Sequence, residues 1–497
     1  MISTRTCATG TLDTYQSSNS KPWDKKRVLH FYQRIGFSAS SEMIEEALAM
    51  NPADFINMMM DDAMAEAPIP EPEWGDWAIS NYDPDNVGPQ ATNQIYEWIS
   101  KWMDKMYSSN PIKAKMTLFW SNHFVTRIDD YGCPSYMYQY HNTIERHCLG
   151  NFKDFTVDMG KNPAMLVFLN GVQNTRFDPN ENYARELLEL FTLGRDIGYT
   201  QSDITEIARA LTGWNGFSEA CAAIDFNEFL HDSGEKTIFG RTGNWDYEGL
   251  HDVLFEERPN EIATFICGKL YRHFVSEEIS DEIVEQLADV LKLNNFEIEP
   301  VVRLLLQSEH FFDDNVLGNK IKSPTEMLLS LVNTTDFPIR DFDLTAEGYN
   351  QLHINAYFLS SEIGQQLFNP PNVAGWEENK SWVTNNTLTG RWQFCDAILG
   401  ALASDYRSRL INFVFGLAEG NDNDVDFIVR AIVEHFIPHG LQNEDAYQRA
   451  ITIFKIQIPE NYFADGSWSL NWEDEIVATQ IFTLLRHLVR QPEFQLY

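Results

Sequence analysis

The chain has 497 residues and a formal net charge of -36, from 73 acidic and 37 basic residues. Hydrophobic residues make up 43% of it and aromatic residues 13%, which is typical of a folded protein with a large core. The acidic balance, without any Lys/Arg-rich run, argues against binding to nucleic acid or to an anionic membrane surface. No run approaches the roughly 18 consecutive apolar residues of a membrane-spanning helix, so we expect no membrane span.

Apolar residues at helical spacing predict helices along most of the chain. As far as residue 334 the predicted helices are 23–35, 41–50, 52–64, 92–108, 111–127, 134–149, 151–160, 180–194, 201–213, 246–255, 258–274, 279–292, 297–308 and 323–334. Residues 66–90 and 335–390 are expected to be long irregular segments, because they are rich in Pro, Asp, Asn and Gly. Alternating residues near 223–240 predict a β-hairpin, and from about 391 the pattern is helical again.

These elements predict an all-α fold: a multi-helix globular body with long irregular loop insertions and one small β-hairpin. Residues 1–22 are polar and are expected to form a flexible leader. We expect one helical domain at 23–400, and a C-terminal helical extension at 401–497 packed on the same body. The sequence from Thr200 to Asp203 is typical of a capping box at the start of a helix.

The N-terminal sequence lacks the apolar stretch of a secretory signal, so a cytoplasmic location is the default expectation. Export with a partner, or as a processed form, stays open. The six cysteines show no CxxC pair, which argues against a disulfide framework and against a cysteine-type zinc site. They are Cys7, Cys133, Cys148, Cys221, Cys267 and Cys395.

The predicted helix at 180–194 combines charged residues with some of the most apolar residues of the sequence. On a regular helix Arg185, Glu186 and Glu189 share one polar arc. That arc could face water, with a Glu181–Arg185 ion pair worth ~0.2–0.5 kcal/mol. It could instead line an internal pocket, where two glutamates three residues apart bind a hard cation or share a proton.

Three further polar residues stand out. His123 lies in an apolar helix without a continuous polar face, so we expect its ring to be buried and to need hydrogen-bond partners. It is either a satisfied core histidine or a ligand or general base beside the acidic helix. His231 and Asp232 lie in a loop where they could orient an imidazole, bind a metal or form only a turn.

A set of segments carries a resemblance to a known family: 119–124, 180–194, 198–200, 208–214, 231–232, 236–237, 322–326, 364–365 and 370–376, with His30, Arg34, Gly36, Phe37, Trp382 and Arg391. Together they resemble DUF1800, a family of bacterial proteins of unknown function, over about residues 23–400. Ser121 is a departure, because the family often places a histidine there. This departure weakens a strict metal-site argument for the present chain.

The resemblance implies a constellation of residues but no reaction. It places Asn182 and six polar candidates inside family motifs, and we take the six as candidate catalytic residues: His123, Arg185, Glu186, Glu189, His231 and Asp232. Glu186, Glu189 and His123 are also the candidate ligands of a divalent metal, which is the only cofactor considered. Family members tend to be encoded beside proteins of the DUF1501 family, which are often exported. The resemblance therefore implies a DUF1501-type partner.

Three functional hypotheses follow, and none decides whether the protein is an enzyme. The first is a polar internal site that binds metal or performs a hydrolysis. The second is a non-catalytic scaffold that docks a DUF1501-type protein through the irregular segments, with Trp74, Trp77, Trp376 and Trp382 as anchors. The third and weaker one is carbohydrate or polymer binding through exposed aromatic residues.

Overall fold

The computed structural model describes residues 10–497 except 109, 216–219, 340–341 and 457. It confirms the all-α prediction, because nearly every regular element is a helix. The helices up to residue 210 are α1 (Lys25–Ile35), α2 (Ser41–Leu48), α3 (Pro52–Ala65), α4 (Val87–Met106), α5 (Ile112–Ser121), α6 (Ile128–Tyr131), α7 (Pro134–His147), α8 (Phe152–Gly160), α9 (Pro163–Phe168), α10 (Asn182–Glu186) and α11 (Gln201–Ala210).

Helices continue through the second half. In the middle of the chain they are α12 (Tyr247–Glu257), α13 (Pro259–Phe274), α14 (Asp281–Leu293), α15 (Glu299–Leu306), α16 (Pro324–Thr334), α17 (Gln351–Glu362) and α18 (Asn385–Ser404). At the C-terminal end they are α19 (Arg407–Ala418), α20 (Val425–Phe436), α21 (Glu444–Phe454), α22 (Glu460–Ala464) and α23 (Asp474–Leu488). Short 3-10 turns are η1 (Ile79–Asn81), η2 (Gly171–Gln173), η4 (Glu228–Leu230), η5 (Asn379–Trp382) and η6 (Pro492–Gln495).

Local capping explains several helix starts. The predicted capping box is present at α11, where the Thr200 hydroxyl accepts from the Asp203 amide and the Asp203 carboxylate accepts from the Thr200 amide. The same exchange between Ser323 and Glu326 begins α16. These local bonds satisfy backbone donors that a helix cannot satisfy itself, which is why the sequence predicts these boundaries well.

The segment after α10 is a π-helix, η3 (Leu187–Thr192), and not the regular α-helix that the sequence predicted. The Thr192 hydroxyl donates to the Leu187 carbonyl at 2.6 Å, five residues earlier, and the Leu193 amide donates to Leu188 at the same spacing. Gly194 follows with φ +99°, a conformation that favours glycine. The wider turn changes the directions of the side chains that the helical wheel assigned to one arc.

The β-structure differs from the single predicted hairpin at 223–240. Strand β2 (Asp225–Phe226) pairs antiparallel with β1 (Trp214–Asn215), whereas β3 (Lys236–Ile238) pairs with β4 (Arg241–Gly243). The second pair is joined by Phe239 and Gly240, both at positive φ, as a two-residue hairpin turn requires. The strand pairing therefore follows turn geometry and not the hydrophobic alternation alone.

Three segments that were predicted to lack regular structure or to be flexible need correction. The region 335–390 contains α17 and η5, and the region 66–90 contains η1 and the first turn of α4. In the leader, residues 1–9 lie outside the described part of the chain, but residues 10–22 lie against the body. Tyr15 is only 1% exposed and its amide donates to the Gln307 carbonyl at 2.8 Å. Burial of this aromatic ring holds the segment in place.

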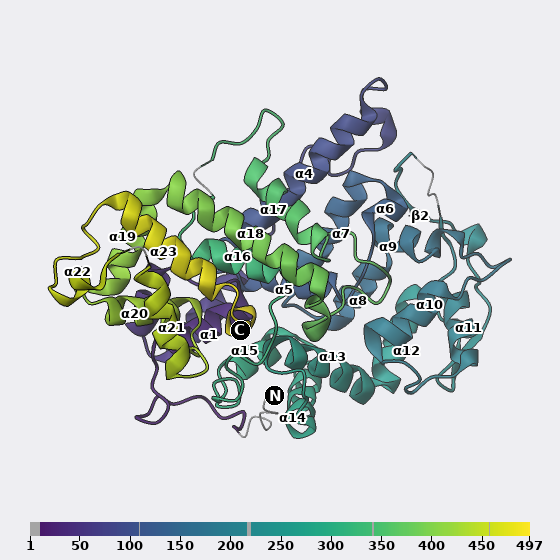
Figure 1. Cartoon of the computed structure of the whole chain (residues 1–497). Helices are drawn as coiled ribbons and strands as arrows, with labels where there is room; N and C mark the ends of the chain where they lie inside the picture. The colour runs from purple at the N-terminus through teal and green to yellow at the C-terminus, as the bar shows by residue number, and fades with distance from the viewer. Residues whose placement is uncertain (1–9, 109, 216–219, 340–341, 457) are drawn as a thin grey trace.

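The helices pack around two apolar clusters. The larger cluster extends from Tyr15 to Phe394, and the smaller one joins the C-terminal helices to residues of α16 and α18, such as Met327 and Cys395. Figure 1 shows α19 to α23 gathered at one side of the molecule and α10 to α12 at the opposite side, with α18 running from the centre toward the C-terminal group. No helix in the described ranges is long and apolar enough to cross a membrane.

A disulfide joins Cys133 to Cys221, with a Cα–Cα distance of 5.7 Å, contrary to the expectation from cysteine spacing. Cys133 lies immediately before α7, while Cys221 lies in the insertion that carries β1 and β2. Partners 88 residues apart cannot be recognised by local spacing, because only the fold brings them together. Cys148, Cys267 and Cys395 are buried free thiols, and Cys7 lies outside the described residues.

Candidate functional site

The polar residues of the predicted acidic helix form an ion-pair network near the surface. Arg185 lies 3.1 Å from Glu181 and 3.5 Å from Glu189, and Glu189 also lies 3.5 Å from Arg195. The Arg185 side chain is 38% exposed and also donates to Gln201 at 3.1 Å. Each ion of this network has a partner within the same surface region. This arrangement is the one expected if the polar arc of the helix faces water.

Glu186 lies on the same helix but takes no part in this ion-pair network. It is partly buried, and no described residue forms a hydrogen bond or an ion pair with its carboxylate. Burial raises the pKa of Glu186, and the neighbouring Glu189 charge raises it further, while Arg185 and Arg195 lower it. A raised carboxyl pKa without a charge partner favours the protonated acid more than usual.

His123 contacts the backbone of η3 and not the acidic side chains. Its Nε2 lies 3.0 Å from the Phe191 carbonyl oxygen, and its Nδ1 lies 3.0 Å from Lys269 Nζ. Burial lowers the pKa of His123 well below its usual range, and the Lys269 charge adds to this effect. The ring is therefore neutral, with Nε2 donating to the carbonyl and Nδ1 accepting from the lysine.

The structure does not assemble the predicted metal ligands. Both ring nitrogens of His123 are engaged, and Glu189 is held by two arginines. Within the described ranges, no group of three or more His, Cys, Asp or Glu residues could hold a metal ion. The set Glu186, Glu189 and His123 is therefore not brought together by the fold.

The His231–Asp232 loop wraps over α11 as a separate cluster. Asp232 accepts from Arg209 Nε at 2.7 Å and from the Gly234 amide at 2.9 Å, and His231 Nδ1 lies 2.9 Å from the Thr212 carbonyl oxygen. Burial works against ionisation of Asp232, but the Arg209 guanidinium outweighs it and lowers the pKa of Asp232. These contacts anchor the loop, and none of them joins it to His123 or to the acidic helix.

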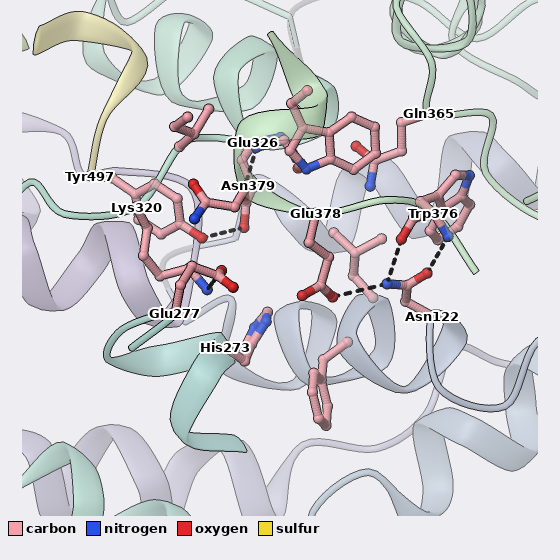
Figure 2. Close-up of a pocket in the computed structure, with 15 residues that line it drawn as sticks. Asn122, His273, Glu277, Lys320, Glu326, Gln365, Trp376, Glu378, Asn379 and Tyr497 are labelled. Atoms are coloured by element: carbon pink, nitrogen blue, oxygen red, sulfur yellow. Dashed lines mark hydrogen bonds and ion pairs between the residues drawn. The ribbon is translucent and has the colours of Figure 1, made fainter. Parts of the chain in front are cut away.

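A different place brings several of the family-like segments together. A cavity of about 60 Å³ lies between α5, α13, the start of α16 and the segment 365–382. By volume it has room for a few water molecules. Figure 2 shows its polar residues converging from these separate elements. The lining residues used below are Asn122, His273, Glu277, Lys320, Ser323, Glu326, Gln365, Trp376, Glu378, Trp382 and Tyr497.

Asn122 holds one wall of this cavity. Its Oδ1 accepts from the Trp376 amide at 2.6 Å, and its Nδ2 donates to Glu378 Oε1 at 3.1 Å (Figure 2). Gly375 has φ +90°, and a Cβ at this residue would lie 2.2 Å from Asn122 Oδ1. Only glycine fits that backbone and that contact, which explains the glycine of the motif at 370–376.

Glu326 holds the opposite wall. It forms a buried ion pair with Lys115 and accepts from the Tyr497 hydroxyl at 3.1 Å and from the Ser323 amide at 2.7 Å. Burial works against ionisation of Glu326, but the Lys115 ammonium and these donors outweigh it and lower the pKa to about 2. Its charge is therefore compensated inside the protein, as a buried carboxylate requires.

His273 is one of the cavity residues that the sequence did not single out. Its Nε2 is buried and has no hydrogen-bond partner among the described residues. Figure 2 shows the ring pointing into the space between Glu277 and Glu378. Burial lowers the pKa of His273 well below its usual range, and the positive Lys115 and Lys320 lower it further. A neutral imidazole can accept a proton or a hydrogen bond through one ring nitrogen and donate a hydrogen bond through the other.

Two other lining residues carry buried polar atoms without a hydrogen-bond partner in the described part of the chain. Glu277 Oε1 has only its ion pair with Lys320, at 3.5 Å, and Trp376 Nε1 has no partner. Buried polar groups are nearly always satisfied, so such atoms indicate a bound water or ligand. The sequence offered one signal: Lys269, His273 and Glu277 recur every four residues along α13 and just past its end.

The tryptophans expected to be docking or sugar-binding anchors are mostly inside the protein. Trp74 and Trp376 are each 5% exposed, Trp382 is 7% exposed, and Trp77 packs against the core. The large hydrophobic residues that are exposed in the described ranges include no tryptophan. Trp376 and Trp382 line the cavity instead, so their role is to shape it.

Comparison with known proteins gives one match. The model of the family described as "Protein of unknown function (DUF1800)" matches residues 30–496. The match extends through the C-terminal helices, beyond residue 400 where the expected coverage stopped. No curated protein and no solved structure matches the chain.

Proposed function

The chain belongs to the DUF1800 family of proteins of unknown function, and on that premise we propose that the cavity of Figure 2 binds a small polar ligand. One observation carries the proposal. Four segments that bear the family resemblance and are far apart in the sequence reach this cavity: 119–124, 322–326, 364–365 and 370–376, through Asn122, Glu326, Gln365 and Trp376, together with Trp382. A purely structural role would not require these segments to meet around unpartnered polar atoms.

Three buried atoms of the lining residues lack a hydrogen-bond partner in the described part of the chain, and they indicate the kind of ligand. Glu277 Oε1 can accept a hydrogen bond, Trp376 Nε1 can donate one, and His273 Nε2 can do either. A ligand with both a donor and an acceptor, such as a small hydroxy or amino compound, satisfies all three. The neutral His273 ring is then the group that exchanges a proton with a bound molecule or with a bound water, which is the hydrolytic version of this function.

A panel of small amino acids, hydroxy acids and polyols tests the proposal by thermal stabilisation. We expect at least one compound to raise the melting temperature of the wild type but not of His273→Ala. His487→Ala is the matched control, because His487 is a partly buried histidine on α23 and does not line the cavity. A panel without any stabilising compound, or one that stabilises His273→Ala equally, would count against the cavity as a ligand site.

The disulfide bears on the compartment of the protein. Because such bonds persist in oxidising environments, the Cys133–Cys221 bond supports folding outside the cytoplasm over the cytoplasmic default. Alkylation of thiols at the moment of cell lysis, followed by mass analysis, tests this. A protein recovered with both cysteines alkylated would support a reducing compartment. A role with a DUF1501-type partner stays a prediction, since its proposed tryptophan anchors are mostly buried.

A further inference from the structure

Lys269 and His123 form a pair that the cavity ligand does not explain. Lys269 Nζ lies 3.0 Å from His123 Nδ1 and 3.4 Å from the Leu190 carbonyl oxygen. We propose that Lys269 is a nucleophilic amine, that His123 is its base, and that the amine forms a covalent imine with small carbonyl compounds. The proposal is independent of the ligand proposed for the cavity.

The first argument is the order of the three groups. A nucleophile within hydrogen-bond reach of a base, with the base oriented by a third group, is the arrangement that activates side chains for covalent chemistry. Here the Phe191 carbonyl accepts from His123 Nε2 at 3.0 Å, which leaves the Nδ1 lone pair directed at the amine. The π-helical turn of η3 supplies both carbonyls, Leu190 and Phe191.

The second argument is the charge around the amine. No carboxylate of a described residue forms an ion pair with Lys269, whereas the buried Lys115 and Lys320 are paired with Glu326 and Glu277. Burial lowers the pKa of Lys269 to about 8, with Glu378 acting against this and Arg272 adding to it. Its other neighbour is the Phe265 ring, 4.9 Å away. A substantial fraction of the amine is therefore neutral near pH 8.

The third argument is exclusion of water. His123 is buried, and the Lys269 amine lies mostly inside the protein although the residue keeps some exposure. The carbonyl compounds that we propose are therefore small ones, of the size of glyoxylate. Exclusion of water around a base and a nucleophile strengthens their interaction.

The chemistry balances without an oxidant or a reductant. The neutral amine nitrogen attacks the carbonyl carbon, a C–N bond forms, and the carbonyl π electrons move to the oxygen. His123 Nδ1 takes a proton from the nitrogen, and the oxygen gains a proton to give a carbinolamine. Loss of the hydroxyl as water, with a second proton from the nitrogen, gives the imine. The products are the imine and one water molecule.

Reductive trapping tests the proposal on the full-length protein. Glyoxylate is the carbonyl probe, borohydride supplies the hydride that fixes the imine, and peptide mass mapping locates the adduct. An amine that titrates near 8 is more than about a hundredfold more deprotonated at that pH than an ordinary lysine. We expect Lys269 to be labelled at least about tenfold faster than the exposed Lys380. Equal rates at the two lysines would overturn the proposal.

Two histidine variants test whether His123 acts as the base. His123→Gln is expected to slow labelling of Lys269 by about tenfold or more, within the usual range for loss of a general base. His251→Gln is the control, because His251 is a fully buried, neutral histidine that bonds only to a backbone carbonyl. An unchanged Lys269 rate in a folded His123→Gln protein would overturn the role of the base.

The wild type alone gives a further readout in case His123→Gln does not fold. The labelling rate of Lys269 is measured against pH. We expect it to level off just above pH 8, whereas a rate that keeps rising toward the ordinary lysine range near 10.5 would overturn the proposal.

Discussion

The Asn122 side chain binds both polar backbone groups of Trp376, a residue 254 positions later in the sequence. Asn122 Oδ1 accepts from the Trp376 amide at 2.6 Å, and Nδ2 donates to the Trp376 carbonyl at 3.4 Å. An amide side chain that pairs with both backbone groups fixes the segment as a strand partner would. This pairing places Glu378 and Trp376 at the cavity, and the substitutions below test what depends on it.

Gly375→Ala should destabilise the protein. The added Cβ would lie 2.2 Å from Asn122 Oδ1, and the backbone φ of +90° is unfavourable for alanine. We expect a loss of about 2–4 kcal/mol in the free energy of unfolding, measured by urea denaturation. Gly400→Ala, in α18 with nothing within 4 Å of the new Cβ, is the control and should gain up to about 1 kcal/mol. Equal stability of the two variants would contradict the close contact at Asn122.

Glu326→Gln should remove a pH-dependent part of the stability. The folded pKa of Glu326 is about 2, below its usual value of 4.5, so its contribution is present above pH 4.5 and is lost as the pH falls toward 2. At neutral pH we expect a loss of about 3–5 kcal/mol, because Lys115 is left buried without its partner. Stability curves from pH 2 to 7 for the two proteins should converge at the acid end. Parallel curves would show that folding does not lower the pKa of Glu326.

Glu186→Gln and Glu181→Gln, on the same stretch of helix, should have opposite effects. The pKa of Glu186 is raised by burial, so ionisation costs stability as the pH rises through the carboxyl range, and glutamine removes that cost. The pKa of Glu181 is lowered by hydrogen bonds from Thr205 and Gln201 and by Arg185. Glu181→Gln should therefore lower the free energy of unfolding at pH values above the carboxyl range, by less than about 1 kcal/mol.

Thermal unfolding of the two variants and the wild type, at one pH below and one pH above the carboxyl range, measures these opposite changes in stability. A loss of stability in Glu186→Gln would mean that the Glu186 carboxylate has a partner, and would contradict the raised pKa.

Reduction of the Cys133–Cys221 disulfide should lower stability by about 2–5 kcal/mol. The bond restricts the unfolded chain over a sequence separation of 88 residues, and it holds the insertion with β1 and β2 against α7. Urea denaturation with and without dithiothreitol measures the effect, and Cys133→Ser/Cys221→Ser should be insensitive to the reductant. Cys395→Ser is a control that retains this sensitivity, because Cys395 is a free thiol.

Local signals made much of the fold predictable. The capping box at Thr200 and Asp203, and the proline at the start of α16, act within a few residues and set helix starts directly. The prediction failed where the outcome depends on distant partners. Helix α17 was missed because its apolar residues pack without a periodic face, and η3 was missed because Thr192 bonds five residues back.

The sequence by itself determined the helical architecture and the family segments, since both are encoded in short-range spacing. It also drew attention to His123, although the ring meets Lys269 and a backbone carbonyl and not the acidic side chains. Only the tertiary structure decided which polar residues share a cavity, because Asn122, His273, Glu326 and Trp376 are separated by long stretches of chain. The cost of burying a polar atom without a partner, such as His273 Nε2 in that cavity, exists only once the chain has folded around it.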